Sequence, residues 1–181
     1  MKAISSISAQ HIFILPNNSN IILAAQQARD LLEGERSVTV IPSKSIPQGI
    51  SAAFSFQEDD SIEMNTDNML NSVNHVKTGQ VTYAVRDTVF DDLVITAGHY
   101  IGIADSKIVA TEEDLLVTSQ GLLSKMLSGQ DEIVTVLTGE EATEEVTESL
   151  IAWIEETYPD VEVEVHSGGQ PIYYYLFSVE S

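Results

Sequence analysis

The sequence predicts a two-lobed α/β protein, in which parallel strands form the first lobe and a mainly antiparallel sheet forms the second. Within residues 11–50 a short apolar run and a polar loop occur twice, each followed by a helical or apolar segment, as in a parallel β–α–β unit. From residue 80 to residue 110 the apolar periodicity drops toward two, which is typical of antiparallel strands joined by turns. We therefore expect a parallel α/β lobe at residues 1–77 and an α+β lobe with an antiparallel sheet at residues 78–181.

The elements expected in the first lobe follow from its apolar runs and from the residues that interrupt them. Pro16 and Pro42 each end an apolar run, and Gly34 supplies a stop for the helix between these runs. The opening residues resemble the end of a helix, so we expect this lobe to be truncated at its N-terminus. The expected elements are strands at residues 12–15 and 38–41, helices at residues 21–32 and 62–76, and an apolar segment that opens at residue 47.

The second lobe should combine the antiparallel strands with two helices. Thr111 to Asp114 has the form of a capping box before a helix that extends to residue 127, and Thr138 begins a cap for a helix that extends to residue 157. The apolar stripe of that second helix consists of Val146, Leu150, Trp153 and Ile154. Further strands are expected at residues 132–137, 161–166 and 172–179, and Asp91–Asp92 is an expected turn.

Composition limits the classes of partner and compartment. The chain has 28 acidic and 8 basic residues and a formal net charge of −20. Binding to nucleic acid or to an anionic membrane surface is therefore not expected, because both need clustered lysine and arginine. Cysteine is absent, which excludes disulfides and thiolate metal sites, and no apolar run approaches the roughly 20 residues of a membrane span. We expect a cytoplasmic protein.

Two polar loops are the first candidate binding site, because they follow the two strands expected to be parallel. The carboxyl ends of parallel strands and the first turns of the next helices lie on the same edge of a sheet, and helix N-termini attract carboxylates and phosphates. The same residue types are ordinary turn and cap residues, so a purely structural role stays open. The candidates are Asn17, Asn18, Ser19, Asn20, Ser43, Lys44 and Ser45.

Other patterns give weaker indications of chemistry. The four histidines lie far apart and form no HxH or HExxH pair, so no metal site is expected. His166 ends an expected strand beside Gly168 and Gly169, where a ligand could approach the backbone, although a lone histidine is more often a structural hydrogen-bonding residue. The acids at the start of the 140–157 helix fit a solvated face better than a site for a metal or a basic partner. The usual hydrolase and nucleotide motifs are absent, and no catalytic residue is expected.

Four distinctive segments cover much of the chain: ILPNNSNI at residues 14–21, IPSKSIPQG at residues 41–49, TYAVRDT at residues 82–88 and HSGGQPIYYY at residues 166–175. Through them the chain resembles the C-terminal region of the bacterial fatty acid kinase A family, the DAK2-domain proteins also called YloV-like. The resemblance implies that a DAK2 kinase domain lies upstream in the same protein. ATP and magnesium would bind there, so no cofactor is expected in this fragment.

The resemblance also implies a DegV-like two-lobed fold and a role beside a DegV-family carrier protein, which would present a fatty acid for phosphorylation of its carboxylate. By analogy with the carriers, the loops at residues 17–20 and 43–48 take the place where a lipid carboxylate is held, and His166 takes the place of a late histidine. The matching segments add Gln48, Arg86 and Gln170 to the candidate site. Asparagines in the first loop and the Gly-Gly-Gln-Pro turn depart from the carrier pattern.

Three functions are compatible with these observations. The favoured one is a non-catalytic module that docks the fatty-acid carrier or assembles the kinase for ATP-dependent acyl phosphate formation. The alternative is a domain that binds a lipid or small anion, such as a fatty acid, between its two lobes. An independent enzyme that uses His166 and a loop serine has the least support.

Overall fold

The computed structural model describes residues 2–90 and 93–181, and the predicted turn at Asp91–Asp92 lies outside the described residues. The chain divides into two compact units, Met1–Val76 and Lys77–Ser181. The first unit contains α1 (Lys2–Ser6), β1 (His11–Ile14), α2 (Ser19–Leu31), β2 (Ser37–Val40), α3 (Ile46–Phe54) and α4 (Ile62–His75). Strands β1 and β2 pair in parallel, with Ile12 opposite Val38, so the predicted parallel β–α–β unit is present.

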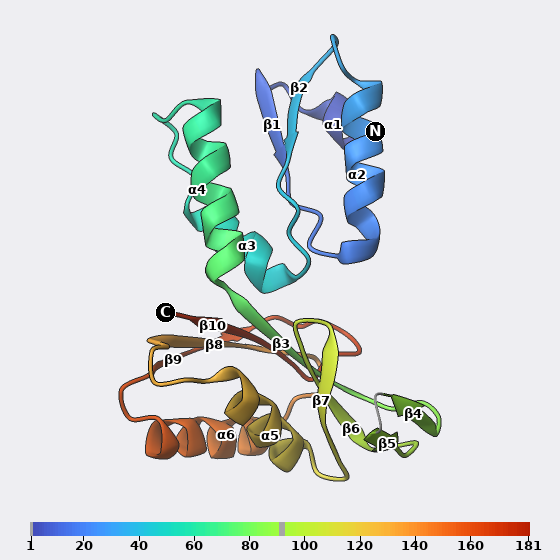
Figure 1. Ribbon diagram of the computed structural model, residues 1–181, viewed down its shortest axis with the longest axis vertical. Helices are drawn as coiled ribbons and strands as arrows, with labels where there is room; N and C mark the ends of the chain where they lie inside the picture. The colour runs from blue at the N-terminus through green and yellow to red at the C-terminus, as the bar shows by residue number, and fades with distance from the viewer. Residues whose placement is uncertain (1, 91–92) are drawn as a thin grey trace. The chain divides into compact units, whose positions relative to one another are not determined.

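Side chains on the two faces of the β1–β2 pair pack against different helices, because successive residues of a strand point to opposite faces. On one face Ile12 packs with Ile4 of α1 and with Leu32 at the end of α2. On the other face Phe13 packs against a cluster that joins β2 to α3 and α4 and consists of Ile41, Ala52, Met69 and Val73. Figure 1 shows the helices on the two sides of the strand pair. The first unit is therefore a small three-layer α/β/α arrangement.

The second unit is built on one six-stranded sheet with the strand order β7-β6-β3-β10-β8-β9. Its pairings are antiparallel except for β8 and β9, which run parallel and are connected through α6. A separate hairpin of β4 and β5 leaves the sheet between β3 and β6. The elements are β3 (Lys77–Tyr83), β4 (Thr88–Phe90), β5 (Leu93–Ile95), β6 (Tyr100–Ala104), β7 (Lys107–Glu112), α5 (Leu115–Met126), β8 (Ile133–Thr138), α6 (Glu144–Thr157), β9 (Glu162–Ser167) and β10 (Tyr175–Glu180).

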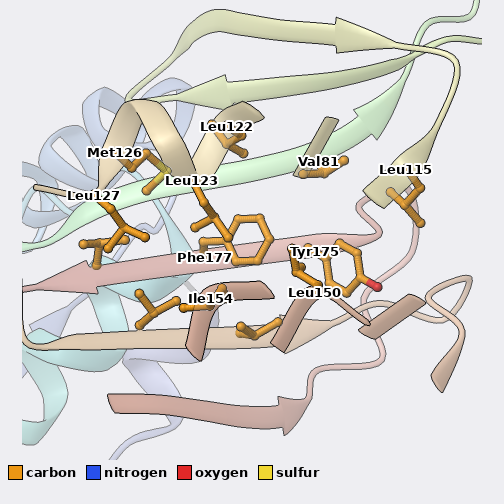
Figure 2. Close-up of a cluster of buried hydrophobic side chains, with 13 residues drawn as sticks. Val81, Leu115, Leu122, Leu123, Met126, Leu127, Leu150, Ile154, Tyr175 and Phe177 are labelled. Atoms are coloured by element: carbon orange, nitrogen blue, oxygen red, sulfur yellow. The ribbon is translucent and has the colours of Figure 1, made fainter. Parts of the chain in front are cut away.

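The core of the second unit lies between this sheet and helices α5 and α6, which cover one of its faces (Figure 1). Strand β10 is central in the sheet, and its Tyr175 and Phe177 are fully buried (Figure 2). The hydroxyl of Tyr175 is hydrogen bonded to Thr147 of α6 at 2.9 Å, so this polar atom is satisfied inside the core. Leu150 and Ile154 of the predicted α6 stripe are fully buried, which confirms that the stripe faces the core.

The two helix caps of the second unit differ from the predicted ones. Asp114, not Thr111, caps α5 by accepting a hydrogen bond from the Val117 N–H at 2.9 Å. Thr143, not Thr138, caps α6. The predicted caps are wrong because Thr111 and Thr138 belong to strands, where the sheet already uses their backbone groups.

A buried carboxylate ties the start of β3 to the end of α5. The Asp131 side chain is 1% exposed, and both its oxygens accept hydrogen bonds from Lys77 Nζ, at 2.7 and 2.9 Å. The backbone N–H and the hydroxyl of Ser128 donate to the same carboxylate. Burial alone would raise the pKa of Asp131, but the hydrogen bonds from Lys77 and Ser128 and the charge of Lys77 outweigh it and lower that pKa.

The connection between β9 and β10 is pinned at several points and contains a strained residue. Ile172 has φ of +75°, a value that is unusual for a β-branched residue. It is the central residue of a γ-turn in which the Tyr173 N–H donates to the Pro171 carbonyl at 2.8 Å. Its carbonyl accepts a hydrogen bond from Thr82 Oγ1 at 3.0 Å. The strand predicted at residues 172–179 therefore begins only at Tyr175, after this turn.

Replacing Asp131 with asparagine should lower the free energy of unfolding at neutral pH by about 2 kcal/mol, because Lys77 and Ser128 lose a charged acceptor. The lowered pKa means that Asp131 stabilises the fold above its ordinary value of 3.8 and that this contribution is lost as the pH falls through the folded-state pKa. The variant should thus lose less stability on acidification than the wild type. Urea denaturation across the acid range measures this, with the exposed Asp160→Asn as control. Equal acid sensitivity in wild type and D131N would contradict the assignment.

Replacing Ile172 with glycine should leave stability unchanged or raise it by up to about 1 kcal/mol. Glycine adopts positive φ without a steric penalty, and this gain offsets the greater entropy of glycine in the unfolded chain. The Ile172 side chain is 66% exposed, so little packing is lost. Val85→Gly is the matched control, because Val85 is 80% exposed and its φ is not positive. Thermal unfolding of both variants measures the difference in stability. A larger loss of stability in I172G than in V85G would contradict backbone strain at Ile172.

Candidate functional site

The two candidate loops of the first unit follow β1 and β2 and are joined by hydrogen bonds to each other. The Asn17 backbone N–H donates to Ser43 Oγ at 3.0 Å, and the Ser43 hydroxyl donates to Asn17 Oδ1 at 2.7 Å. Ser43 is fully buried, and Asn17 has φ of +56°, a conformation that asparagine tolerates better than most residues. The hydroxyl of Ser43 therefore both donates and accepts within the chain.

Helix α3 reaches this pair closely enough that only glycine fits. A Cβ atom on Gly49 would overlap the side-chain amide of Asn17. The Gly49 backbone N–H donates to the Ser45 carbonyl at 3.1 Å, inside the first turn of α3. Gly49 was not among the predicted site residues, although its place at the end of the segment IPSKSIPQG was a signal for a close backbone approach.

The other candidates in these loops cap helices or lie in solvent. Asn18 caps α2 by accepting from the Asn20 N–H at 2.9 Å, and Ser45 caps α3 by accepting from the Gln48 N–H at 3.3 Å. Gln48 accepts from the Lys44 N–H at 2.8 Å. Three loop or helix N–H groups that could hold an anion therefore already have acceptors. The side chains of Ser19, Asn20 and Lys44 are exposed.

The glycine-rich candidates of the second unit form hydrogen bonds to backbone carbonyls at the carboxyl end of β8. The N–H groups of Gly168 and Gly169 both donate to the Thr138 carbonyl, each at 3.0 Å. The Gln170 side chain folds back and donates to the Leu137 carbonyl at 3.0 Å. A Cβ atom on Gly168 would overlap this side chain, so a larger residue there would have to displace the Gln170 amide.

His166 and Arg86 are the remaining candidates, and both are exposed. His166 lies on the edge strand β9, where Nε2 is 3.5 Å from a Glu164 carboxylate oxygen, a long contact for an ion pair. Arg86 follows β3 in the second unit, and over the described part of the chain no ion pair involves it. Its guanidinium is open to solvent and to a partner.

The chemistry of the described residues gives no sign of an acid–base or metal centre. Burial lowers the pKa of His11 and raises that of Tyr175, while burial and a hydrogen bond to Glu141 raise the pKa of Tyr174. Burial is the largest cause of all three shifts, and at Tyr174 the neighbouring Glu141 carboxylate adds to it. Within residues 2–90 and 93–181, no three His, Asp or Glu side chains gather as a metal site. In the same ranges, no helix combines the length and apolar character that a membrane span requires.

Several solved structures have a similar fold. The fatty acid kinase B3 protein of Streptococcus pneumoniae, loaded with linoleic acid, matches with a TM-score of 0.67 and 14% identity over 99% of this chain and 74% of its own. A DegV lipid-binding protein from Thermotoga maritima matches with a TM-score of 0.68 and 12% identity, covering 99% of this chain and 72% of that protein. The dihydroxyacetone kinase of C. freundii gives a TM-score of 0.66 and 10% identity over 99% of this chain and 40% of its own. At these identities the matches show a DegV-like α/β fold.

Relatives that are similar in sequence identify the family of this chain more closely than the solved structures do. Uncharacterized proteins of Staphylococcus aureus strains MRSA252 and USA300 are each 49% identical over 180 residues, covering 99% of this chain. The match covers 32% of each relative, so the chain spans about a third of the length of the curated relatives it matches. The family model of the FakA-like C-terminal domain of fatty acid kinase matches residues 1–180. The chain therefore belongs to the family of FakA-like C-terminal domains of fatty acid kinase.

Proposed function

We propose that this chain is a non-catalytic docking module of a fatty acid kinase, which binds a DegV-family fatty-acid carrier or assembles the kinase around it. The observation that carries the proposal is the mutual hydrogen bonding of Asn17 and Ser43, with Ser43 fully buried. By resemblance, these loops occupy the place where carriers hold a lipid carboxylate. A carboxylate bound there would have to displace the half-buried Asn17 amide from the Ser43 hydroxyl.

The cost of such a displacement favours docking over lipid binding. Leaving a buried polar group without a partner costs about 1–3 kcal/mol, which a bound carboxylate would have to offset before gaining any affinity. The S. pneumoniae protein of similar fold is loaded with linoleic acid, whereas here Asn17 and Ser43 are hydrogen bonded to each other. A copy of the carrier fold whose ligand loops are closed is suited to recognising another protein.

The rest of the proposed reaction lies outside this chain. We infer that the whole protein forms an acyl phosphate, with ATP and magnesium held by an upstream DAK2 kinase domain and the fatty acid held by the carrier. The described residues of this chain would then supply neither nucleophile nor base. Their part is to bring the carrier to the kinase domain, which raises the effective concentration of the two reacting groups.

The chain should form a one-to-one complex with a DegV-family carrier from the same organism and should carry no lipid of its own. Isothermal titration calorimetry measures the association, and native mass spectrometry of the purified chain reports co-purifying lipid. A bovine serum albumin titration with the same fatty acid load serves as a control for non-specific lipid transfer. Absence of carrier binding would contradict the docking role, and a stoichiometric bound fatty acid would favour the ligand-binding alternative.

Replacing Ser43 with alanine separates a structural role from a ligand-binding role. If the hydroxyl serves Asn17, the variant should lose about 2 kcal/mol of unfolding free energy in the first unit and bind the carrier as the wild type does. Ser19→Ala is the matched control, because Ser19 is an exposed serine in the same pair of loops and its loss should cost less than about 0.5 kcal/mol. Unchanged stability of S43A, together with loss of a bound anion or lipid, would overturn this assignment.

A further inference from the structure

Helix α3 reverses the usual distribution of large and small apolar residues. Its buried positions carry Pro47, Gly49 and Ala52. Its large apolar side chains point outward instead: Ile46 is 43% exposed, Ile50 is 40% exposed and Phe54 is 82% exposed. An amphipathic helix of a globular protein normally buries its largest apolar residues.

The reversal has a cause inside the first unit. The Asn17 side chain lies where a Cβ atom of Gly49 would be, so α3 approaches its neighbours too closely for large residues on that face. The exposed residues Ile46, Ile50 and Phe54 recur every four positions, which places them along one side of the helix. We call these three residues the α3 stripe. Such i, i+4, i+8 anchors are the form in which an apolar helix face enters a groove of another protein.

The α3 stripe lies in an uncharged segment of an acidic chain. The chain has a net charge of −20, yet no charged residue occurs between Lys44 and Glu58. Exposed carboxylates follow directly, because Glu58 and Asp59 lie in the turn after α3. The stripe is thus an uncharged apolar surface with negative charge beyond one end.

The acidic turn is held in a fixed position relative to the helices of its unit. Asn65 of α4 is 2% exposed and accepts a hydrogen bond from the Gln57 N–H at 2.8 Å. Its amide nitrogen donates to the carbonyls of Gln57, at 2.8 Å, and Asp60, at 3.3 Å. Residues 57–60 are therefore anchored to α4, and a partner meets these carboxylates without first having to order the turn.

We propose that the α3 stripe is the docking surface for a protein partner with an apolar groove and with lysine or arginine residues at the end of the groove that faces Glu58 and Asp59. The proposal rests on the proposed docking function and names the surface that performs it. The negative charge of the chain favours a basic protein partner over the other possible occupants of the stripe. A second copy of the chain would bring another −20, and an anionic membrane would repel the acidic turn.

The test compares Phe54→Ser and Ile50→Ser with Leu31→Ser in binding to a DegV-family carrier from the same organism. Leu31, at the end of α2, is 73% exposed and lies outside the α3 stripe, so it matches the change in chemistry. Phe54→Ser should weaken carrier binding by at least about tenfold, as expected for an anchor residue, while Leu31→Ser stays within about twofold. All three substitutions alter exposed side chains, and circular dichroism checks that the variants fold.

Charge reversal tests the basic rim independently. Glu58→Lys combined with Asp59→Lys should weaken binding and reduce its dependence on salt, because attraction between the acidic turn and a basic rim is screened by ions. Glu156→Lys, an exposed acid on α6, serves as the control and should have a smaller effect.

The possible results separate a failure of the α3 stripe from a failure of the docking function. Carrier binding that is intact in the wild type and in F54S would overturn the α3 stripe and leave the docking function in place. No binding by the wild type would overturn the docking function itself. Concentration-dependent dimerisation that F54S abolishes, measured by light scattering, would assign the stripe to a second copy of the chain. Binding to neutral phosphatidylcholine vesicles would assign it to a lipid surface, and either result would overturn the proposal.

Discussion

Hydrogen bonding at the carboxyl ends of parallel strands is the constraint on which this structure depends. Parallel strands leave backbone groups unpaired where they end, and those groups need partners from loops, water or a ligand. After β1 and β2, the Asn17 backbone and amide pair with the Ser43 hydroxyl. After β8 and β9, the Thr138 carbonyl accepts from both glycines of the 168–169 turn, and Gln170 satisfies Leu137. Both units close these ends with their own residues.

Hydrogen bonds made within the chain at the strand ends leave fewer groups free to bind a ligand, while the fold stays the same. In an open α/β protein the same groups form a ligand site, since they are fixed in position and lack partners. Here the Ser43 hydroxyl is paired with Asn17. The N–H groups of Asn20, Lys44 and Gln48 also have acceptors within these loops. A DegV-like architecture is therefore compatible with a chain that recognises proteins instead of small molecules. Two proteins that share a fold do not for that reason bind the same ligand.

The spacing of apolar residues correctly predicted strands and helices whose pattern lies within a few residues. The predicted helix caps were wrong where pairing with a distant strand determines the structure. The parallel pairing of β1 with β2 and the stripe of α6 follow from apolar spacing within a few residues. The helix caps were misplaced because Thr111 and Thr138 have the right local sequence but are used by the sheet. The partnership of Asn17 with Ser43 joins residues 26 positions apart, and the sequence offered these two only as members of separate polar loops. Whether such residues serve a ligand or each other is decided by distances that the sequence does not contain.

The closed loops and the exposed α3 stripe have a common physical origin. Once the Asn17 amide occupies the space beside Gly49, α3 can pack inward only through small residues such as Pro47 and Ala52. The large apolar residues of a helix that has no charged side chain must then face outward. An exposed phenylalanine and two isoleucines carry a free-energy cost of exposure that association with another apolar surface removes. The contact between Asn17 and Ser43 thus also leaves large apolar side chains of α3 at the surface.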